Sequence, residues 1–255
     1  MTGLSPEQFA WLAAEVAALV DWDAPTGRPR ALPLATALVM VLFLLRHNLA
    51  EDATGELFGC STATIWRYQD DLEPVIDEIL AILADQITAA AHREGVLVDG
   101  LVAPVGEREG VEHLFSDKKG FCGQNIQVVA NLDGRVVDVG EPCPGSMHDA
   151  RAFQASGIAG RWVAHYQPGG LGMTGDKGYQ GTRVIVPDKK QPGGELSTEA
   201  RAYNRSVSAI RAAVERAIAH LKNWKILKTG YRRALIDFPR VLRTVTRLEM
   251  YRAFG

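Results

Sequence analysis

The N-terminal part of the chain carries apolar residues at helical spacing. Ser5 stands before a stretch in which an apolar residue recurs every three or four positions, so a helix over 5–22 with Ser5 as its N-cap is expected. A short helix, a turn at 59–60 and a helix capped by Ser61 or Thr62 follow, which is the layout of a helix-turn-helix. Further helices are expected over 33–47, over 50–58 and through Tyr68. A separate helix is expected from Pro74 to about 93, and its apolar side is formed by Val75, Ile79, Ile82, Leu83 and Ile87.

The pattern changes to strands at Gly95. Strands are expected over 96–105, 125–132, 135–142, just before 175, and over 183–187, and helices over 146–156, 197–229 and 235–253. Asp133-Gly134 is a hairpin signal, so the first three strands predict an antiparallel meander. A later strand reached through a helix can lie parallel to the first. The expected fold is therefore α/β, a ribonuclease-H-like mixed sheet flanked by helices over 95–255, preceded by an all-helical domain with a helix-turn-helix over 1–94.

Composition narrows the class of protein. The 255 residues are 47% hydrophobic and 23% charged, which excludes a disordered or low-complexity chain. The three cysteines form no disulfide framework or Cys-x-x-Cys pair, which favours a reducing cytosol. The apolar run over 32–45 is 14 residues long, short of the ~18–20 that span a bilayer. A buried core helix is the better interpretation, and no membrane role is expected.

Charge is distributed unevenly along the chain. Residues 183–255 hold 16 Lys and Arg against 6 Asp and Glu, a net +10, whereas residues 1–98 are net −9. One interpretation is a footprint for a polyanion. The other is an Arg-rich helical surface that neutralises the acidic N-terminal third.

Three acids are candidates for metal-dependent phosphodiester chemistry, which needs carboxylates from different elements around two divalent ions. Asp99 lies in the apolar strand 96–105, where a lone carboxylate is costly unless it holds a metal or pairs with an arginine. Asp176 follows a strand between two glycines, as a metal ligand or the acid of an Asx-turn. Glu215 lies on the long C-terminal helix and is expected to point partly inward.

Other polar residues are candidates beside these acids. Arg211, Glu215 and Lys222 fall on one face of a helix, which is either a phosphate-facing surface or an ordinary ion pair. Ser146 and Asp149 fit a capping box, S-x-x-D, and Asp149 is the reserve candidate for the second ligand. The adjacent His148 could act as a general base or touch DNA.

Several motifs together resemble a known family. They are VDG at 98–100, KKGFCGQNIQVVANLDG at 118–134, PGSMHDARAF at 144–153, GDKGYQG at 175–181 and NRSVSAIRAAVERAIAHLKNWKIL at 204–227. Their order and spacing are similar to those of bacterial insertion-sequence transposases of the DDE superfamily, the group related to the Harbinger elements. The resemblance covers about 95–235 and extends to the N-terminal helix-turn-helix. The family signature has a tyrosine where this chain has Ser208.

The resemblance implies a catalytic triad of Asp99, Asp176 and Glu215 that binds two Mg²⁺ or Mn²⁺ ions. It implies cleavage and strand transfer at the terminal inverted repeats of an insertion sequence, with transfer into target DNA. Arg211, Lys222 and Lys177 would then neutralise phosphates. A homodimer or larger assembly on DNA is expected because two ends must be cut together, in the cytoplasm of a bacterial cell and associated with the nucleoid.

Alternatives remain for both parts of the chain. The helix-turn-helix can read DNA, with Thr62, Thr64, Arg67 and Gln69 as possible groove contacts. Alternatively it is a dimerisation or packing module, since the acids at 70–73 oppose a phosphate backbone. The whole chain can be a catalytically inactive or domesticated DNA-binding protein derived from such an element. A metal-dependent phosphohydrolase of small phosphate esters would leave the helix-turn-helix and the basic segment unexplained.

Overall fold

The computed structural model describes residues 1–23, 29–190 and 193–255, which form two compact units. The helical unit comprises Met1–Asp85, Lys222–Thr229 and Arg233–Gly255, and the mixed unit comprises Gln86–Leu221 and Gly230–Arg232. This division differs from the expected boundary at 94, because it falls within the long helix Thr62–Ala91 and because the last helix packs with the first ones. The chain therefore leaves the helical unit, builds the mixed unit and returns.

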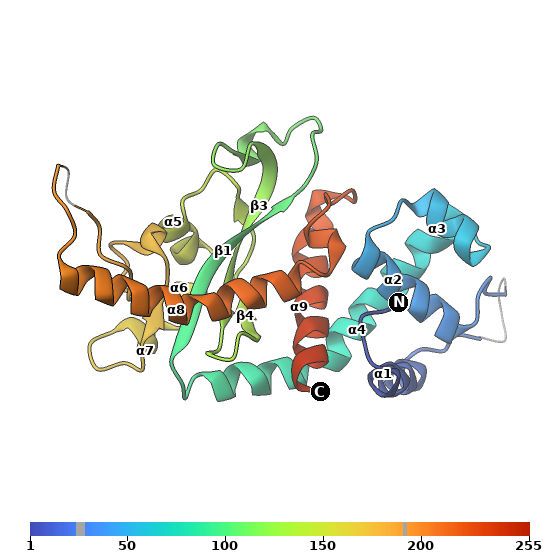
Figure 1. The fold of residues 1–255 in the computed structure, drawn as a ribbon. Coiled ribbons are helices and arrows are strands. Elements are labelled where there is room, and N and C mark those ends of the chain that lie inside the picture. The colour runs from blue at the N-terminus through green and yellow to red at the C-terminus, as the bar shows by residue number, and fades with distance from the viewer. Residues whose placement is uncertain (24–28, 191–192) are drawn as a thin grey trace. The chain divides into compact units, whose positions relative to one another are not determined.

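The helical unit is built from capped, amphipathic segments. Its elements are α1 (Pro6–Leu19), α2 (Leu34–His47), α3 (Glu51–Phe58), α4 (Thr62–Ala91), the 3₁₀ turns η3 (Lys225–Leu227) and η4 (Leu235–Asp237), and α9 (Phe238–Phe254) (Figure 1). Ser5 caps α1 as expected, and it forms a capping box with Gln8. Gly59, with φ +69°, ends α3 in the left-handed conformation and makes the turn of the helix-turn-helix.

The prediction of two helices over 61–93 is wrong, because α4 continues through Pro74 as one helix of 30 residues. Its buried positions keep one helical phase on both sides of the proline, and they are Ile65, Tyr68, Leu72, Ile76 and Leu80. Burial of that continuous stripe holds the helix together across a residue that would otherwise end it. The buried stripe is also rotated from the expected face, since Ile82 is 72% exposed.

Acidic residues on α4 pair with arginines of the C-terminal segment 233–247. The pairs are Glu73 with Arg233 and Arg240 at 2.6 and 2.7 Å, and Asp77 with Arg243 and Arg247 at 2.8 Å each. The Glu73 side chain has no exposed surface. Burial raises the pKa of Glu73, while the two arginines act to lower it. For these residues the neutralising interpretation of the basic segment holds, because the arginines are engaged by acids of the same unit.

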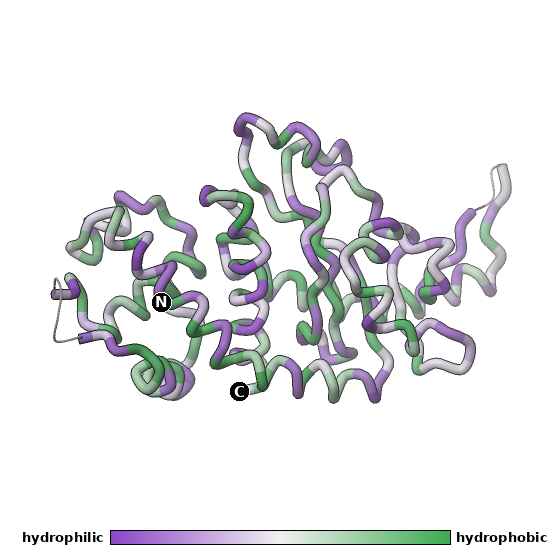
Figure 2. Tube along the Cα trace, turned by 180° about the vertical axis from the view of Figure 1, so that it is seen from behind, coloured by the Kyte–Doolittle hydropathy of each residue, from purple (hydrophilic) through white to green (hydrophobic). Residues whose placement is uncertain are grey.

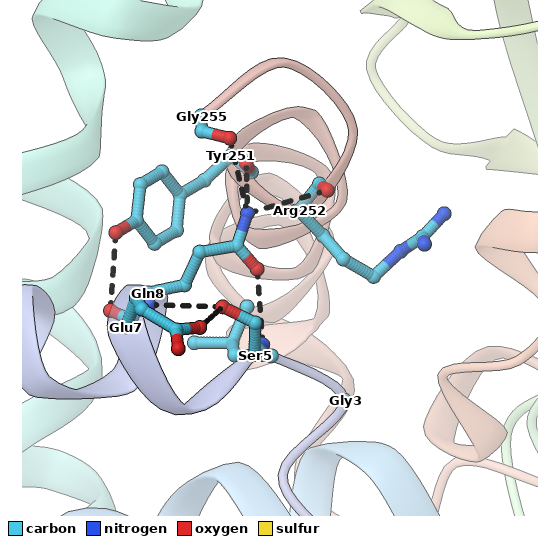
Figure 3. Close-up of a pocket in the computed structure, with 8 residues that line it drawn as sticks. Gly3, Ser5, Glu7, Gln8, Tyr251, Arg252 and Gly255 are labelled. Carbon is cyan, nitrogen blue, oxygen red and sulfur yellow. Dashed lines mark hydrogen bonds between the residues drawn. The ribbon is translucent and has the colours of Figure 1, made fainter.

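The ends of α1 and α9 meet around a hollow of about 640 Å³ (Figure 3). The Gln8 amide nitrogen lies 3.2–3.4 Å from the carbonyl oxygens of Tyr251, Arg252 and Gly255. In return, the Tyr251 hydroxyl donates to the Gln8 carbonyl at 3.0 Å. Gln8 thus satisfies carbonyls that the end of α9 leaves without intrahelical partners, which accounts for this hollow as a helix cap.

The mixed unit is a sheet with helices packed on it. Its strands are β1 (Val96–Pro104), β2 (Phe115–Ser116), β3 (Phe121–Ala130), β4 (Val136–Val139), β5 (Cys143–Pro144) and β6 (Met173–Thr174). Its helices are α5 (Asp149–Ala155), α6 (Ile158–Arg161), α7 (Val163–Tyr166) and α8 (Thr198–Leu221), with the 3₁₀ turns η1 (Glu112–Leu114) and η2 (Lys177–Tyr179). Hydrophobic residues follow the central strands (Figure 2).

The sheet has the predicted connectivity. β3 pairs antiparallel with both β1 and β4, which is the expected meander, and β6 pairs parallel with β1. The hairpin turn lies at Asp133-Gly134, where Gly134 adopts φ +80°. Helix α8 packs across β1, β3 and β4, and α5 packs on β3 (Figure 1). A helical region with a helix-turn-helix followed by this mixed sheet is the ribonuclease-H-like architecture that was expected.

Two predicted elements of the mixed unit are corrected. The strand over 183–187 is reduced to one parallel bridge between Thr174 and Ile185, because Arg183 has φ +68° and interrupts the extended backbone. The helix expected to reach 229 ends at Leu221. No helix in the described part of the chain has both the length and the apolarity to cross a bilayer.

Candidate active site

Parallel pairing of β1 and β6 brings two candidate acids to one edge of the sheet. The last pair is Leu97 with Thr174, and Asp99 and Asp176 each follow two residues later on their own segments. Because parallel strands run in the same direction, equal offsets from a shared pair place both acids at the same end of the sheet. The predicted neighbourhood of Asp99 and Asp176 therefore follows from the register.

Asp99 is held by two donors in a largely buried position. The Gly100 N–H donates to Asp99 Oδ1 at 2.8 Å, and Arg211 Nη2 on α8 donates to Oδ2 at 3.1 Å. Burial raises the pKa of Asp99, and the charges of Asp176 and Asp149 raise it further, against the lowering effect of Gly100 and Arg211. The charge on Asp99 is thus costly unless a cation compensates it. The structure shows the arginine pair, one of the two interpretations of this acid, and the metal interpretation stays a proposal.

Arg211 also contacts the third predicted acid. The same Nη2 atom lies 3.8 Å from Glu215 Oε1, one helical turn further along α8. A single guanidinium nitrogen therefore lies within ion-pair distance of both Asp99 and Glu215. The Glu215 side chain is 63% exposed, so the expectation that it points partly inward is corrected. Positions 213, 214, 217 and 218 form the buried face of α8 instead.

Asp176 makes the Asx-turn that was one of the two roles suggested by its sequence position. It is the N-cap of η2, and its Oδ1 accepts from the Gly178 N–H at 2.6 Å, which is the Asx-turn interaction. This bond fixes the carboxylate at the sheet edge rather than removing it from the acidic group. A Cβ atom at Gly178 would lie 2.8 Å from Asp176 Oδ1 and 3.0 Å from Asp149 Oδ2, so both carboxylates flank this glycine.

Asp149 is part of the acidic group, and the predicted capping box is wrong. The N-cap of α5 is His148, without a side-chain cap, and Ser146 Oγ instead donates to the His113 carbonyl at 3.2 Å. Asp149 Oδ1 accepts from Asn125 Nδ2 at 3.2 Å. A Cβ atom at Gly100 would lie 2.5 Å from the same Oδ1. The glycine after Asp99 thus makes room for Asp149 beside β1.

Two hollows border this group of acids. One, of about 250 Å³, is lined by Asp99 and Asp149 together with Lys118, Lys119 and the exposed His148. The Lys118 ammonium lies 4.0 Å from Asp149 Oδ2.

The other hollow, of about 260 Å³, is lined by Asp176, Lys177, Ser208 and Arg211. Both hollows are lined by acids and by basic side chains, which suits a phosphate held next to a bound metal ion. Lys222 follows the end of α8 and belongs to the helical unit, so the single face predicted for Arg211, Glu215 and Lys222 does not form on one helix.

The residues present suit a divalent cation by their chemistry. Mg²⁺ prefers carboxylate oxygens and retains several waters, and these acids offer such oxygens beside mutually repelling charges. Over the described ranges, no group of three acid, histidine or cysteine side chains lies close enough together, as the side chains stand, to hold a metal ion. The fit therefore rests on the chemistry of the carboxylate oxygens, and Arg211 is the counter-ion that the structure shows for Asp99 and Glu215.

The predicted groove contacts of the helix-turn-helix are only partly on its surface. Thr64 is 9% exposed and Gln69 2% exposed, so these two contacts are corrected, since both point into the helical core. Thr62 is half-buried, Arg67 is exposed, and Trp66, which sequence reasoning missed, is 54% exposed. The helical phase of the buried residues Ile65 and Tyr68, if applied to this segment, would have found Trp66.

Comparisons with known proteins agree with this geometry. A family model described as DDE superfamily endonuclease matches residues 98–248, and one described as helix-turn-helix of DDE superfamily endonuclease matches residues 30–82. A Streptomyces albus G protein assigned as the transposase of insertion sequence element IS112 is 32% identical over 230 residues, covering 89% of this chain and 84% of that protein.

More distant relatives extend the match. A Microchaete diplosiphon protein assigned as the transposase of insertion sequence element IS702 is 25% identical, covering 91% of this chain and 85% of that protein. A Mus musculus protein assigned as the nuclease HARBI1 is 22% identical over 85% of this chain and 65% of that protein. No solved structure gave a significant match. The chain belongs to the transposase family of DDE superfamily endonucleases.

Proposed function

We propose that the chain is an active transposase that cuts DNA at the ends of an insertion sequence and transfers the freed strand into a target. The mixed unit would carry the cleavage site, with Asp99, Asp176 and Glu215 holding two Mg²⁺ or Mn²⁺ ions. The helical unit would read the terminal repeats. The observation that carries the proposal is the arrangement around Arg211, which contacts Asp99 and Glu215 while parallel register places Asp176 beside Asp99.

The residues of the site divide the work of phosphodiester cleavage. When bound, the two cations would activate the attacking oxygen and stabilise the leaving oxygen. Asp99, on a rigid central strand, and Asp176, fixed by its Asx-turn, hold their carboxylates in place. Lys177 and Lys118 on the rims of the two hollows would bind the phosphates on either side of the cut bond. Arg211 would stabilise charge at Asp99 and Glu215 between catalytic cycles.

The Asp176→Asn variant is expected to lose cleavage of DNA that carries the element's own ends. Asparagine can still accept the Gly178 N–H bond, so the turn is kept while one charged ligand is lost. The measurement is nicking of a labelled end fragment in the presence of Mg²⁺ or Mn²⁺, for the wild type and the variant. Metal-dependent nicking at the element boundary that the substitution abolishes would support the proposal.

Two other results would change the assignment. Cleavage that survives Asp176→Asn would remove Asp176 from the triad and move the second ligand to Asp149. Absence of cleavage by the wild type, with DNA binding intact, would contradict active transposition and favour a catalytically inactive DNA-binding protein. Turnover of small phosphate esters without DNA cleavage would favour a phosphohydrolase. Assembly as a homodimer on DNA is part of the proposal, because two element ends must be cut together.

DNA reading by α4 is expected to depend on Arg67. This residue is exposed on the second helix of the motif, so its guanidinium can reach base edges in the major groove. Arg67→Ala is expected to weaken binding to the terminal repeat by about tenfold or more, as loss of a bidentate arginine–guanine contact does. The measurement is a fluorescence-anisotropy titration with repeat and scrambled duplexes at fixed salt.

The Arg67→Lys variant separates base reading from phosphate binding. Lysine keeps the charge but cannot form a bidentate contact, so discrimination between the two duplexes should fall while affinity for scrambled DNA is kept. Equal affinity of wild type and Arg67→Ala for the repeat would instead favour the dimerisation role of this motif.

A further inference from the structure

A chain of buried polar side chains runs from η2 to Asp149. The Tyr179 hydroxyl donates to Gln127 Oε1 at 2.6 Å, and Gln127 Nε2 donates to Asn125 Oδ1 at 2.9 Å. Asn125 Nδ2 in turn donates to Asp149 Oδ1 at 3.2 Å and to the Met147 carbonyl at 2.9 Å. Tyr179, Gln127 and Asn125 are 0%, 0% and 2% exposed. This series of hydrogen bonds therefore crosses the core of the mixed unit. It ends at the carboxylate of Asp149, which lines the hollow of about 250 Å³.

Donor and acceptor chemistry fixes the direction of every hydrogen bond in this series. The Asp149 carboxylate and the Met147 carbonyl only accept, so Asn125 must present its amide nitrogen to them. Its oxygen then faces Gln127 and needs a donor, which leaves the Gln127 oxygen to face Tyr179. The Tyr179 hydroxyl supplies the donor that completes the order. Burial and the surrounding carboxylates raise the pKa of Tyr179 well above its usual value, so it keeps this proton.

Filling a core with such a series of polar side chains costs more free energy than filling it with apolar ones. Buried amides and hydroxyls cost free energy unless each one is satisfied, and apolar side chains would fill the same volume without that constraint. The result of this arrangement is that one carboxylate, that of Asp149, is held in a fixed orientation. Asp149 lies between Gly100, which follows Asp99, and Gly178, which is close to Asp176. A side chain at either glycine would press on the Asp149 carboxylate.

We propose that Tyr179, Gln127 and Asn125 are positioning residues that hold Asp149 in place as a fourth carboxylate facing the divalent cations of the site. The inference rests on the proposed function, because it concerns the same cations. In this arrangement Asp149 adds to the Asp99, Asp176 and Glu215 set rather than replacing a member of it. Tyr179 and Gln127 line neither hollow, whereas Asn125 lines the hollow that Asp149 also lines. Tyr179 and Gln127 therefore act through Asn125 and Asp149.

The test uses Mn²⁺ binding to the full chain, measured by calorimetric titration with MnCl₂ in the absence of DNA. Tyr179→Phe removes only the hydroxyl that begins the chain. It is expected to weaken Mn²⁺ binding by up to about tenfold, the lower end of what loss of a direct hydrogen bond to a metal ligand costs, because Tyr179 reaches Asp149 only through Gln127 and Asn125. Asp149→Asn is expected to weaken binding at least as much, and thermal unfolding of each variant checks that the fold is kept.

The chain offers a matched control in Tyr166→Phe. Tyr166 and Tyr179 both pack edge-on against Phe153, with ring centroids 5.6 and 5.8 Å away, and each hydroxyl donates one bond. The Tyr166 hydroxyl donates to the Ala159 carbonyl at 2.7 Å and not to the chain that ends at Asp149. Tyr166→Phe should therefore bind Mn²⁺ as the wild type does.

A double variant tests whether Tyr179 acts through Asp149. If it does, Tyr179→Phe combined with Asp149→Asn should bind Mn²⁺ no more weakly than Asp149→Asn alone. Wild-type affinity in Tyr179→Phe, or a double variant that shows the product of both single effects, would overturn the inference. So would a wild-type chain that binds no Mn²⁺. Mn²⁺ binding with this variant pattern, but without DNA cleavage, would count against the proposed function and leave the positioning role supported.

Discussion

Asp99→Asn is expected to reduce metal-dependent cleavage of element-end DNA by about a thousandfold or more. The substitution keeps the shape of the side chain and an acceptor for the Gly100 N–H, but it removes the charge closest to Arg211. Stabilisation of transition-state charge by a correctly held metal is worth several kcal/mol, which corresponds to a factor of about 10³ in rate. The measurement is the single-turnover rate of nicking at saturating Mg²⁺.

Asp138 provides a closely matched control for Asp99. It also lies on a strand of the mixed unit, with a side chain 14% exposed against 17% for Asp99. It accepts from the N–H of the next residue at 2.7 Å and from Arg161 at 2.9 Å. Asp138→Asn is therefore expected to cleave at the wild-type rate. Equal losses in both variants would show that the effect arises from folding, and an active Asp99→Asn would exclude Asp99 as a metal ligand.

Glu73→Ala is expected to lower the free energy of unfolding of the helical unit by about 3–5 kcal/mol, the cost of removing one partner from a buried ion pair. Burial raises the pKa of Glu73 despite the two arginines, so the charged carboxylate is held in the core at a cost that its partners offset. The loss of stability arises because Arg233 and Arg240, with side chains 12% and 23% exposed, lose their nearest acid and keep longer pairs, both with Asp70 at 3.5 Å and Arg240 also with Asp237 at 3.5 Å.

Urea unfolding followed by tryptophan fluorescence measures this effect. Of the five tryptophans, only Trp162 belongs to the mixed unit, so the signal reports mainly the helical unit. Glu78→Ala, at an exposed position of the same helix, should change stability by no more than about 0.5 kcal/mol. A loss below 1 kcal/mol in Glu73→Ala would show that the arginines find other partners or water.

Local patterns predicted the elements that depend on local chemistry. The Ser5 cap, the turn at Gly59 and the Asp133-Gly134 hairpin form as expected, because each is decided by a few adjacent residues. The strands β1, β3 and β4 also follow from their own apolar sequences. Asp99 could be chosen as a candidate because it interrupts one of these apolar strands, a signal that needs no tertiary information.

The errors arose where distant residues decide the local structure. Asp149 fits a capping motif by spacing, but Asn125 from another strand holds its carboxylate at the site. Pro74 suggests a helix start, but packing on both sides of it keeps α4 continuous. The pairing of Glu73 with Arg233 crosses 160 positions, which no window of sequence can show. Sequence reasoning named these acids as candidates but could not show the contacts between them.

The return of α9 to the helical unit has a consequence for synthesis on the ribosome. The residues matched as a helix-turn-helix, 30–82, emerge early, but Glu73 and Asp77 obtain their arginines only after the whole mixed unit has been made. A product that stops after residue 221 would contain the complete motif and lack the helix that covers its acids. Shortened copies of the gene would therefore yield a poorly folded motif, rather than a competitor that occupies the element's ends.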